Sequence, residues 1–331
     1  MALTRWIAGI VAGATLPLFS MGVMAQARAD DGSDYPSKVV RIVVGYGAGG
    51  GSDAMGRLFA QLLGERMNQT FIVENRPGAG GNIAAEYVAK SNDPYKLLFG
   101  VGAHVINASL YAKIPYDPIK DFTPISLMAV APNVLVAKPA LGVKNLREVI
   151  ALAKARPGEI SYASPGTGTP MHLAMELFAS MAGIKLIHVP YNGGGTAVAA
   201  ALGGQTDLLT MSLPTVLPHI QSGKLVPLGV TSRARSSLLP EMPTVEESAG
   251  LAGYEALAWY GLLGPAGMSP AAAQRLNAAI SQELKNPEVK QKLIAQGFEP
   301  AQTTPAEFLS FLVDDMHKWA KVVKESGARA D

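Results

Sequence analysis

The chain has 331 residues, which is room for about two domains of ordinary size. Charged residues make up 16% of it, below the ~25% of an average soluble protein, and 28 basic residues nearly balance 26 acidic ones. The formal charge of +2, without a long run of either sign, excludes the basic surface that phosphate backbones require, so we expect no nucleic-acid partner.

The first residues are typical of an export signal. Arg5 gives a positive start, an apolar stretch follows, and small residues suit cleavage after Ala27, which makes residues 1–27 a signal peptide. Cleavage after Ala29 fits as well. A membrane anchor is the alternative, and Pro17 inside the apolar stretch argues against it. The chain has no cysteine, which excludes disulfides and lipid attachment through a cysteine. We therefore predict a soluble protein of the periplasm.

From Lys38 onward, short β-branched runs alternate with segments of helical periodicity, which predicts an α/β fold with parallel strands. In the first series, strands are expected at 38–44, 70–75 and 96–101, each followed by a helix. The next apolar run, 124–138, is long enough for a strand that crosses between two domains.

A second series follows the crossing strand. Helices are expected at 146–156, 172–183 and 196–204. Strands are expected at 160–164, 185–191, 206–212 and 225–232. The apolar run 254–267 could cross back, and the rest of the chain is expected to be helical. Ser269 and Pro270 suit a helix start, and residues 304–307 form a capping box.

Glycine-rich turns close strands in both series. The turns GAGGGSD (47–53) and SPGTGTP (164–170) each open a helix, whose first amides are unpaired donors at the positive end of the helix dipole. We interpret them as two anion sites that face a cleft between the domains. Such turns need glycine and a hydroxyl residue whatever they bind, so a purely structural role stays open for either turn alone. Asp53 would repel an anion, and we expect it to pair with Arg57.

A dinucleotide site is a weaker interpretation of the first turn. Gly45, Gly47 and Gly50 match the G-x-G-x-x-G pattern, which needs an acidic residue after the next strand. Glu74 lies near that place, but a second glycine cluster follows it at once, and exported proteins rarely meet the cofactor. We therefore expect no cofactor.

Catalytic chemistry has little support either. Ser52 is a near miss to the G-x-S-x-G pattern of hydrolases, but it lies well beyond the strand end, where a nucleophile elbow would not place it. The five histidines show no metal-binding spacing, so we expect no metal. His172 falls in the first turn of a helix, and we interpret it as a capping or packing residue.

Motifs along the chain resemble one known family. In order, they include VENRPGAGGNIAAE, PYDPIKDF, SYASPGTGTPMHLA, HVPYNGG, LGGQTDLL, LPEMPTVEE and GYEALAWYGLLGPAG. Together they resemble the Bug (Bordetella uptake gene) proteins, the solute-binding receptors of tripartite tricarboxylate transporters. The resemblance implies a type II periplasmic binding protein fold, with two α/β domains joined by hinge strands and a ligand cleft between them. It implies one domain of residues 36–129 together with 256–331, and a second of residues 130–255.

The resemblance also implies a function. Such a receptor is a periplasmic monomer without catalytic activity, and it delivers an amino acid, a di- or tricarboxylate or an aromatic carboxylate to inner-membrane transporter subunits. Main-chain groups of the two glycine-rich turns would hold the carboxylate. A periplasmic hydrolase that uses Ser52, and a carboxylate sensor without a permease, are the alternatives. The ligand-binding positions carried over are Tyr46, Ala48, Gly50, Gly51, Ser52, Thr167, Gly168, Thr169, Asn192, Met211 and Ser212.

Overall fold

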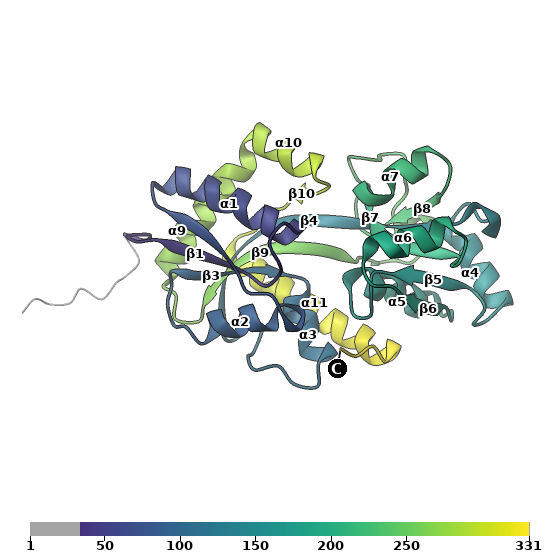
Figure 1. Ribbon diagram of the computed structural model, residues 1–331, viewed down its shortest axis with the longest axis horizontal. Helices are drawn as coiled ribbons and strands as arrows, with labels where there is room; N and C mark the ends of the chain where they lie inside the picture. The colour runs from purple at the N-terminus through teal and green to yellow at the C-terminus, as the bar shows by residue number, and fades with distance from the viewer. Residues whose placement is uncertain (1–33, 331) are drawn as a thin grey trace, which may run out of the picture. The chain divides into compact units, whose positions relative to one another are not determined.

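The first strand of the chain lies between two parallel neighbours. The structure, a computed structural model, describes residues 34–330, so the expected signal peptide and both cleavage points lie outside the described residues. β1 pairs in parallel with β2 on one side and with β3 on the other, and three helices connect and follow these strands, as expected (Figure 1). These elements are β1 (Val40–Val44), α1 (Gly51–Met67), β2 (Phe71–Asn75), the 3₁₀ turn Ala79–Gly81, α2 (Asn82–Ala89), β3 (Lys96–Val101) and α3 (Ala103–Leu110).

Two long strands join two sections of one sheet. β4 (Phe122–Ala137) pairs antiparallel with β9 (Leu257–Pro265) as far as Pro132. From Asn133 onward it pairs with β7 on one edge and with β8 on the other. The first section therefore comprises β1, β2, β3, β9 and the start of β4, and the second section comprises the end of β4 with the strands that follow it. Both apolar runs expected to cross between domains are strands, which confirms that prediction (Figure 1).

The second section repeats the parallel βα pattern. β5 pairs in parallel with β6 and with β7, while β7 and β8 run antiparallel to β4. Its elements are the 3₁₀ turn Pro139–Leu141, α4 (Leu146–Ala155), β5 (Ser161–Ser164), α5 (Pro170–Ala182), β6 (Ile187–Pro190), α6 (Gly194–Leu202), β7 (Leu208–Ser212), α7 (Leu213–Gln221), β8 (Val226–Val230) and α8 (Val245–Ala249). Two helices were not expected from the sequence: α7, which contains two prolines, and the five-residue α8.

The C-terminal part is helical, as expected. It comprises α9 (Pro270–Lys285), α10 (Pro287–Ala295), the two-residue strand β10 (Glu299–Pro300) and α11 (Pro305–Ser326). The Ser269 side chain caps α9, and Thr304 and Glu307 form the expected capping box of α11. Among residues 34–330, no helix has the length and apolar character needed to cross a membrane.

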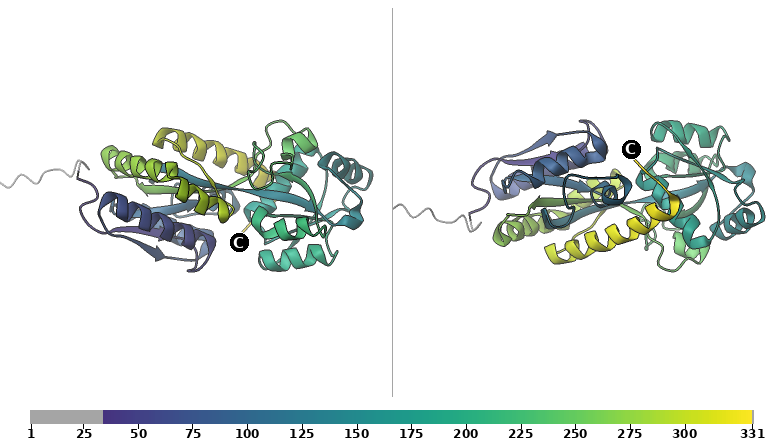
Figure 2. Two further views of the ribbon diagram at one scale, coloured as in Figure 1. Left: turned by 90° about the horizontal axis from the view of Figure 1, so that it is seen from above. Right: turned by 90° about the horizontal axis from the view of Figure 1, so that it is seen from below.

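The last helix packs against both sections of the sheet. Phe308 and Leu312, near the start of α11, are buried with residues of β3 and β9. Trp319 and Val323, near its end, are buried in a different cluster with Phe178 of α5. Figure 2 shows α11 running along the molecule from one section to the other. The helix is therefore a third connection between the sections, beside β4 and β9.

Candidate functional site

The turn between β1 and α1 presents a row of unpaired backbone donors. α1 begins after Gly50, which has extended backbone (φ −80°, ψ 170°) and no side chain to cap the helix. Glycines leave the turn free of side chains, and those from Gly47 to Gly51 are exposed. The free amides at a helix start can bind an anion. Within residues 34–330, no acceptor meets the amides of Tyr46, Gly47, Ala48, Gly50, Gly51, Ser52 and Asp53.

The Asp53 carboxylate is engaged by three other donors. It accepts hydrogen bonds from the Gly49 amide (2.9 Å), from Arg57 Nε (3.0 Å) and from Asn75 Nδ2 (2.8 Å), and its side chain is buried. The hydrogen bond from Arg57, followed by those from Gly49 and Asn75, lowers the pKa of Asp53 to about 2. The predicted pairing with Arg57 is confirmed. The carboxylate thus holds the turn together, and the Arg57 guanidinium offsets part of its charge.

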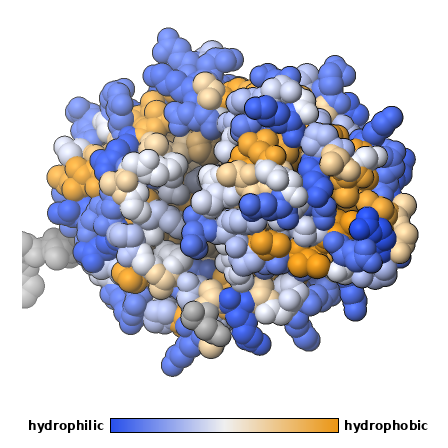
Figure 3. Space-filling view, turned by 45° about the vertical axis from the view of Figure 1, so that its right-hand side comes forward, coloured by the Kyte–Doolittle hydropathy of each residue, from blue (hydrophilic) through white to orange (hydrophobic). Residues whose placement is uncertain are grey.

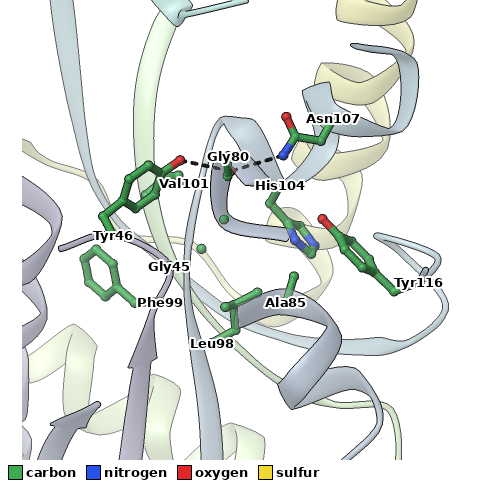
Figure 4. A pocket seen from close by; sticks show the side chains of 12 residues that line it. Gly45, Tyr46, Gly80, Ala85, Leu98, Phe99, Val101, His104, Asn107 and Tyr116 are labelled. Atoms are coloured by element: carbon green, nitrogen blue, oxygen red, sulfur yellow. Dashed lines mark hydrogen bonds between the residues drawn. The ribbon is translucent and has the colours of Figure 1, made fainter. Parts of the chain in front are cut away.

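A small cavity lies behind this turn and the neighbouring one. Tyr46 Oη and Asn107 Nδ2 both donate to the Gly80 carbonyl, at 3.3 and 3.1 Å, and so fix the second turn against the first (Figure 4). Gly45 allows their close approach, since a β-carbon there would lie 2.8 Å from the α-carbon of Gly81. The cavity has a volume of about 20 Å³. In this conformation that is room for about one water molecule and too little for an organic acid.

His104 contributes a buried imidazole to the wall of this cavity (Figure 4). Its Nε2 lies 2.8 Å from the Pro118 carbonyl and therefore carries the proton, while its Nδ1 has no partner among the described residues. Burial lowers the pKa of His104 to about 4, so the ring is neutral at physiological pH. No motif in the sequence places this histidine beside the first turn.

The second glycine-rich turn is organised differently. Thr169 caps α5: its Oγ1 accepts from the His172 amide (3.3 Å) and donates to the Gly166 carbonyl (2.8 Å). The Gly168 amide, which the anion-site interpretation needs as a donor, instead donates to His172 Nδ1 at 3.0 Å. Within residues 34–330, the amides of Thr167 and Met171 meet no acceptor. The donors available here are therefore the Thr167 amide and hydroxyl and the Met171 amide.

The remaining candidates lie on two later turns. Asn192 is exposed just before α6, and Ser212 precedes α7 with its Oγ 2.8 Å from Thr215 Oγ1. Met211 is buried among apolar residues, and its Cε lies 2.5 Å from where a β-carbon of Gly194 would be. Its side chain therefore packs against Gly194, the first residue of α6. The surface is hollowed near the middle of the face shown in Figure 3.

The site carries little sign of catalysis or metal binding. In the described part of the chain, no group of three or more histidine and acidic side chains could hold a metal ion. Among the same residues, Ser52 Oγ makes no hydrogen bond to a histidine, and the neighbouring Asp53 carboxylate is already engaged. A serine without a base is a weak nucleophile.

Comparison with known proteins identifies the family. The sequence model of the TctC family, described as the tripartite tricarboxylate transporter family receptor, matches residues 55–328. The chain belongs to this family. The protein BugT of Bordetella pertussis is 36% identical over 311 residues, which cover 93% of this chain and 94% of BugT. The predicted resemblance to the Bug proteins is confirmed.

Solved structures of the TctC type share the fold. Rpa4515 of R. palustris, solved with adipate, has a TM-score of 0.74 and 33% identity, over 89% of this chain and 99% of that one. MatC of Rhodopseudomonas palustris, solved with bound malate, has a TM-score of 0.70 and 28% identity, over 87% of this chain and 100% of that one. This chain therefore has the predicted fold of a type II periplasmic binding protein, with two α/β domains.

Proposed function

We propose that this protein is a periplasmic receptor that captures a small organic carboxylate and delivers it to the inner-membrane subunits of a tripartite tricarboxylate transporter. The observation that carries the proposal is the row of unpaired amides at the start of α1, which the Asp53 carboxylate leaves free because it bonds to other donors. Family membership and the adipate and malate of two TctC-type structures support it. We also propose that the protein is exported, loses residues 1–27 and acts as a monomer.

The two domains of the proposal are residues 36–129 with 256–331, and residues 130–255. The pairing of β4 supports this division, because the strand changes partners between Pro132 and Asn133, close to the proposed boundary. The second boundary falls just before β9, the strand that returns to the first section. A hinge across β4 and β9 would let the two domains close over a ligand.

Binding and closure follow from where the donors lie. The amides that begin α1 and the Thr167 and Met171 donors belong to different domains, so one carboxylate can use both sets only in a closed form. A ligand shifts a conformational equilibrium by the difference in its affinity for the two states. Hydrogen bonds to a charged group contribute about 1.5–3 kcal/mol each, so a few of them reach micromolar affinity, about −8 kcal/mol.

The first test asks which acids bind. Ligands that bind only the native state raise its melting temperature. The full mature chain should be screened against malate, adipate, amino acids and aromatic acids, with the matching neutral amides as controls. We expect one class of acid to raise the melting temperature and its amide to leave it unchanged. No shift with any acid would contradict the proposal.

The second test removes one amide from the α1 start. Gly51 is the first residue of α1, a position that suits proline, and a β-carbon there would meet nothing within 4 Å. Gly51→Pro deletes the donor, and Gly51→Ala is the matched control that keeps it. We expect the alanine variant to bind like the parent chain and the proline variant to bind about tenfold more weakly or worse. Equal affinities would show that the ligand does not use this amide.

We further propose that the protein is not an enzyme. Its family consists of binding proteins, and Ser52 lacks a base among the described residues. Ester hydrolysis by the purified chain that disappears in Ser52→Ala would overturn this proposal, whereas unchanged carboxylate binding in the same variant would support it.

A further inference from the structure

The second glycine-rich turn rests on a buried layer of polar side chains. His172, in the first turn of α5, is 4% exposed, and its Nδ1 accepts the Gly168 amide at 3.0 Å. His188 of β6 lies under the same turn, with its Nε2 2.7 Å from Ser164 Oγ. The Ser164 hydroxyl in turn contacts the carbonyl and the amide of Gly166. His172 therefore holds the turn directly at Gly168, and His188 holds it at Gly166 through the Ser164 hydroxyl.

The contact with Gly168 fixes the position of the proton on His172. His172 Nδ1 accepts a hydrogen bond, so its proton is on Nε2, which lies 3.8 Å from Glu176 Oε1. The two imidazoles stack with ring centroids 3.9 Å apart, an arrangement that two cations could not share. Tyr162 stacks on both rings and donates its hydroxyl to Glu176. Burial lowers the pKa of His172 to about 3 and that of His188 to about 4.

The Gly168 hydrogen bond decides which amides the turn presents. Gly168 has a left-handed backbone (φ +76°), and its amide is directed at the imidazole beneath the turn. The amide of Thr167 meets no acceptor in the described chain and is left for a ligand. Without the acceptor at His172, the partly buried Gly168 amide would lose its hydrogen-bond partner, and the turn would move to a conformation that supplies another one.

We propose that His172 is a positioning residue of the carboxylate site: its neutral Nδ1 withdraws the Gly168 amide from the ligand and holds the Thr167 amide and hydroxyl in place to receive it. The inference rests on the proposed function and deepens it, because it assigns to one side chain the choice of main-chain donors in the second domain. His188 supports the same turn through Ser164.

The test compares two substitutions that differ in the acceptor. Asparagine places its Oδ1 close to the position of histidine Nδ1, so His172→Asn keeps an acceptor for Gly168. His172→Phe keeps a flat ring and loses the acceptor. Tyr254→Phe is the control for general destabilisation, since it removes a buried hydrogen bond to the Ala174 carbonyl of the same helix without touching the turn. Each full-length mature variant is titrated calorimetrically with malate and with adipate.

We expect His172→Asn and Tyr254→Phe to bind within a few-fold of the parent chain, and His172→Phe to bind about tenfold more weakly. The proposal is overturned if His172→Phe retains the parental affinity. It is also overturned if His172→Asn, or Tyr254→Phe, loses as much affinity as His172→Phe. The last outcome would mean that loosening α5 suffices.

A second readout separates this proposal from the proposed function. Amide hydrogen exchange in the unliganded protein reports on the Gly168 hydrogen bond whether or not either acid binds. If the parent chain binds neither malate nor adipate, the choice of ligand is wrong, and the role of His172 is then judged from hydrogen exchange alone. Faster exchange at Gly168 in His172→Phe, restored to the parental rate in His172→Asn, would still support the positioning role. Unchanged exchange in His172→Phe would overturn it.

Discussion

Leu110, at the end of α3, lies against the α-carbon of Gly168 in the second glycine-rich turn. A β-carbon at Gly168 would lie 2.5 Å from Leu110 Cδ2. The two residues belong to the two different domains of the proposed receptor, and the Leu110 carbonyl also accepts a hydrogen bond from the Ala330 amide near the C-terminus (3.1 Å). The turn proposed to bind a carboxylate is thus in contact with the other domain and, through Leu110, with the end of the chain.

Gly168→Ala should destabilise the protein and weaken carboxylate binding. The glycine combines a left-handed backbone (φ +76°) with the Leu110 contact, and strain of this kind costs about 1–3 kcal/mol. Gly142→Ala is a matched control, because Gly142 has a similar φ of +73° and open space around it. Urea unfolding should give a larger loss for position 168, and calorimetry should show weaker binding there alone. Equal losses of stability would mean that the Leu110 contact is easily relieved.

Asp53→Ala should weaken carboxylate binding although it removes a negative charge next to an anion site. The carboxylate orders the first turn through Gly49, Arg57 and Asn75, and a disordered turn loses more entropy when it binds. Asp53→Asn, which keeps one acceptor oxygen, should fall between the alanine variant and the parent chain. Calorimetric titration at low and high salt measures both effects. Tighter binding by Asp53→Ala would show that charge repulsion outweighs the ordering of the turn.

Much of the fold and part of the site are readable from the sequence, for physical reasons. The crossing strands β4 and β9 were expected because a long apolar run in an α/β protein is typical of a buried strand that extends across the sheet. The pairing of Asp53 with Arg57 follows from helical spacing alone. Local patterns of this kind do not depend on distant parts of the chain.

Contacts between distant segments could not be read in this way. The acceptor for the Gly168 amide depends on the tautomer and direction of the His172 ring, which stacks on a histidine of another strand. The buried state of Met211 depends on α6 packing above it. Short elements such as α8 and β10 carry too few residues for a period to show. The roles of the predicted ligand-binding positions stay predictions.

The stability of the protein should fall on acidification below pH 6.5, in part because of His104. Its pKa is about 4 in the folded protein, against 6.5 for the unperturbed side chain. Between these values the unfolded chain binds a proton that the folded chain does not, so the folded state loses stability as the pH falls. For this buried ring the loss amounts to about 3 kcal/mol across the window.

His104→Gln removes this titration while keeping an amide donor for the Pro118 carbonyl. Unfolding free energies measured in urea from pH 4 to pH 7 should therefore depend less steeply on pH in the variant than in the parent chain. Parallel curves would show that His104 takes up its proton in the folded state as readily as in the unfolded one.

Asn133 lies where β4 changes partners, and its buried side-chain amide makes no hydrogen bond to the described residues. It is 1% exposed, and neither Nδ2 nor Oδ1 has a partner among the described residues. Its backbone, by contrast, is satisfied by Thr231: the Asn133 amide donates to Thr231 Oγ1 (2.8 Å), and its carbonyl accepts from the Thr231 amide (2.9 Å). Substitutions at these two positions should therefore change stability in opposite directions.

Asn133→Leu should raise the free energy of unfolding by about 1 kcal/mol, because an apolar side chain of similar size needs no partner. Thr231→Val should lower it by about 1–3 kcal/mol, because it leaves the buried Asn133 amide without its acceptor. Urea unfolding of both variants measures the two signs. If Asn133→Leu instead weakens both folding and carboxylate binding, then the amide has a partner in solution, and a water molecule or the ligand itself at this strand crossing supplies it.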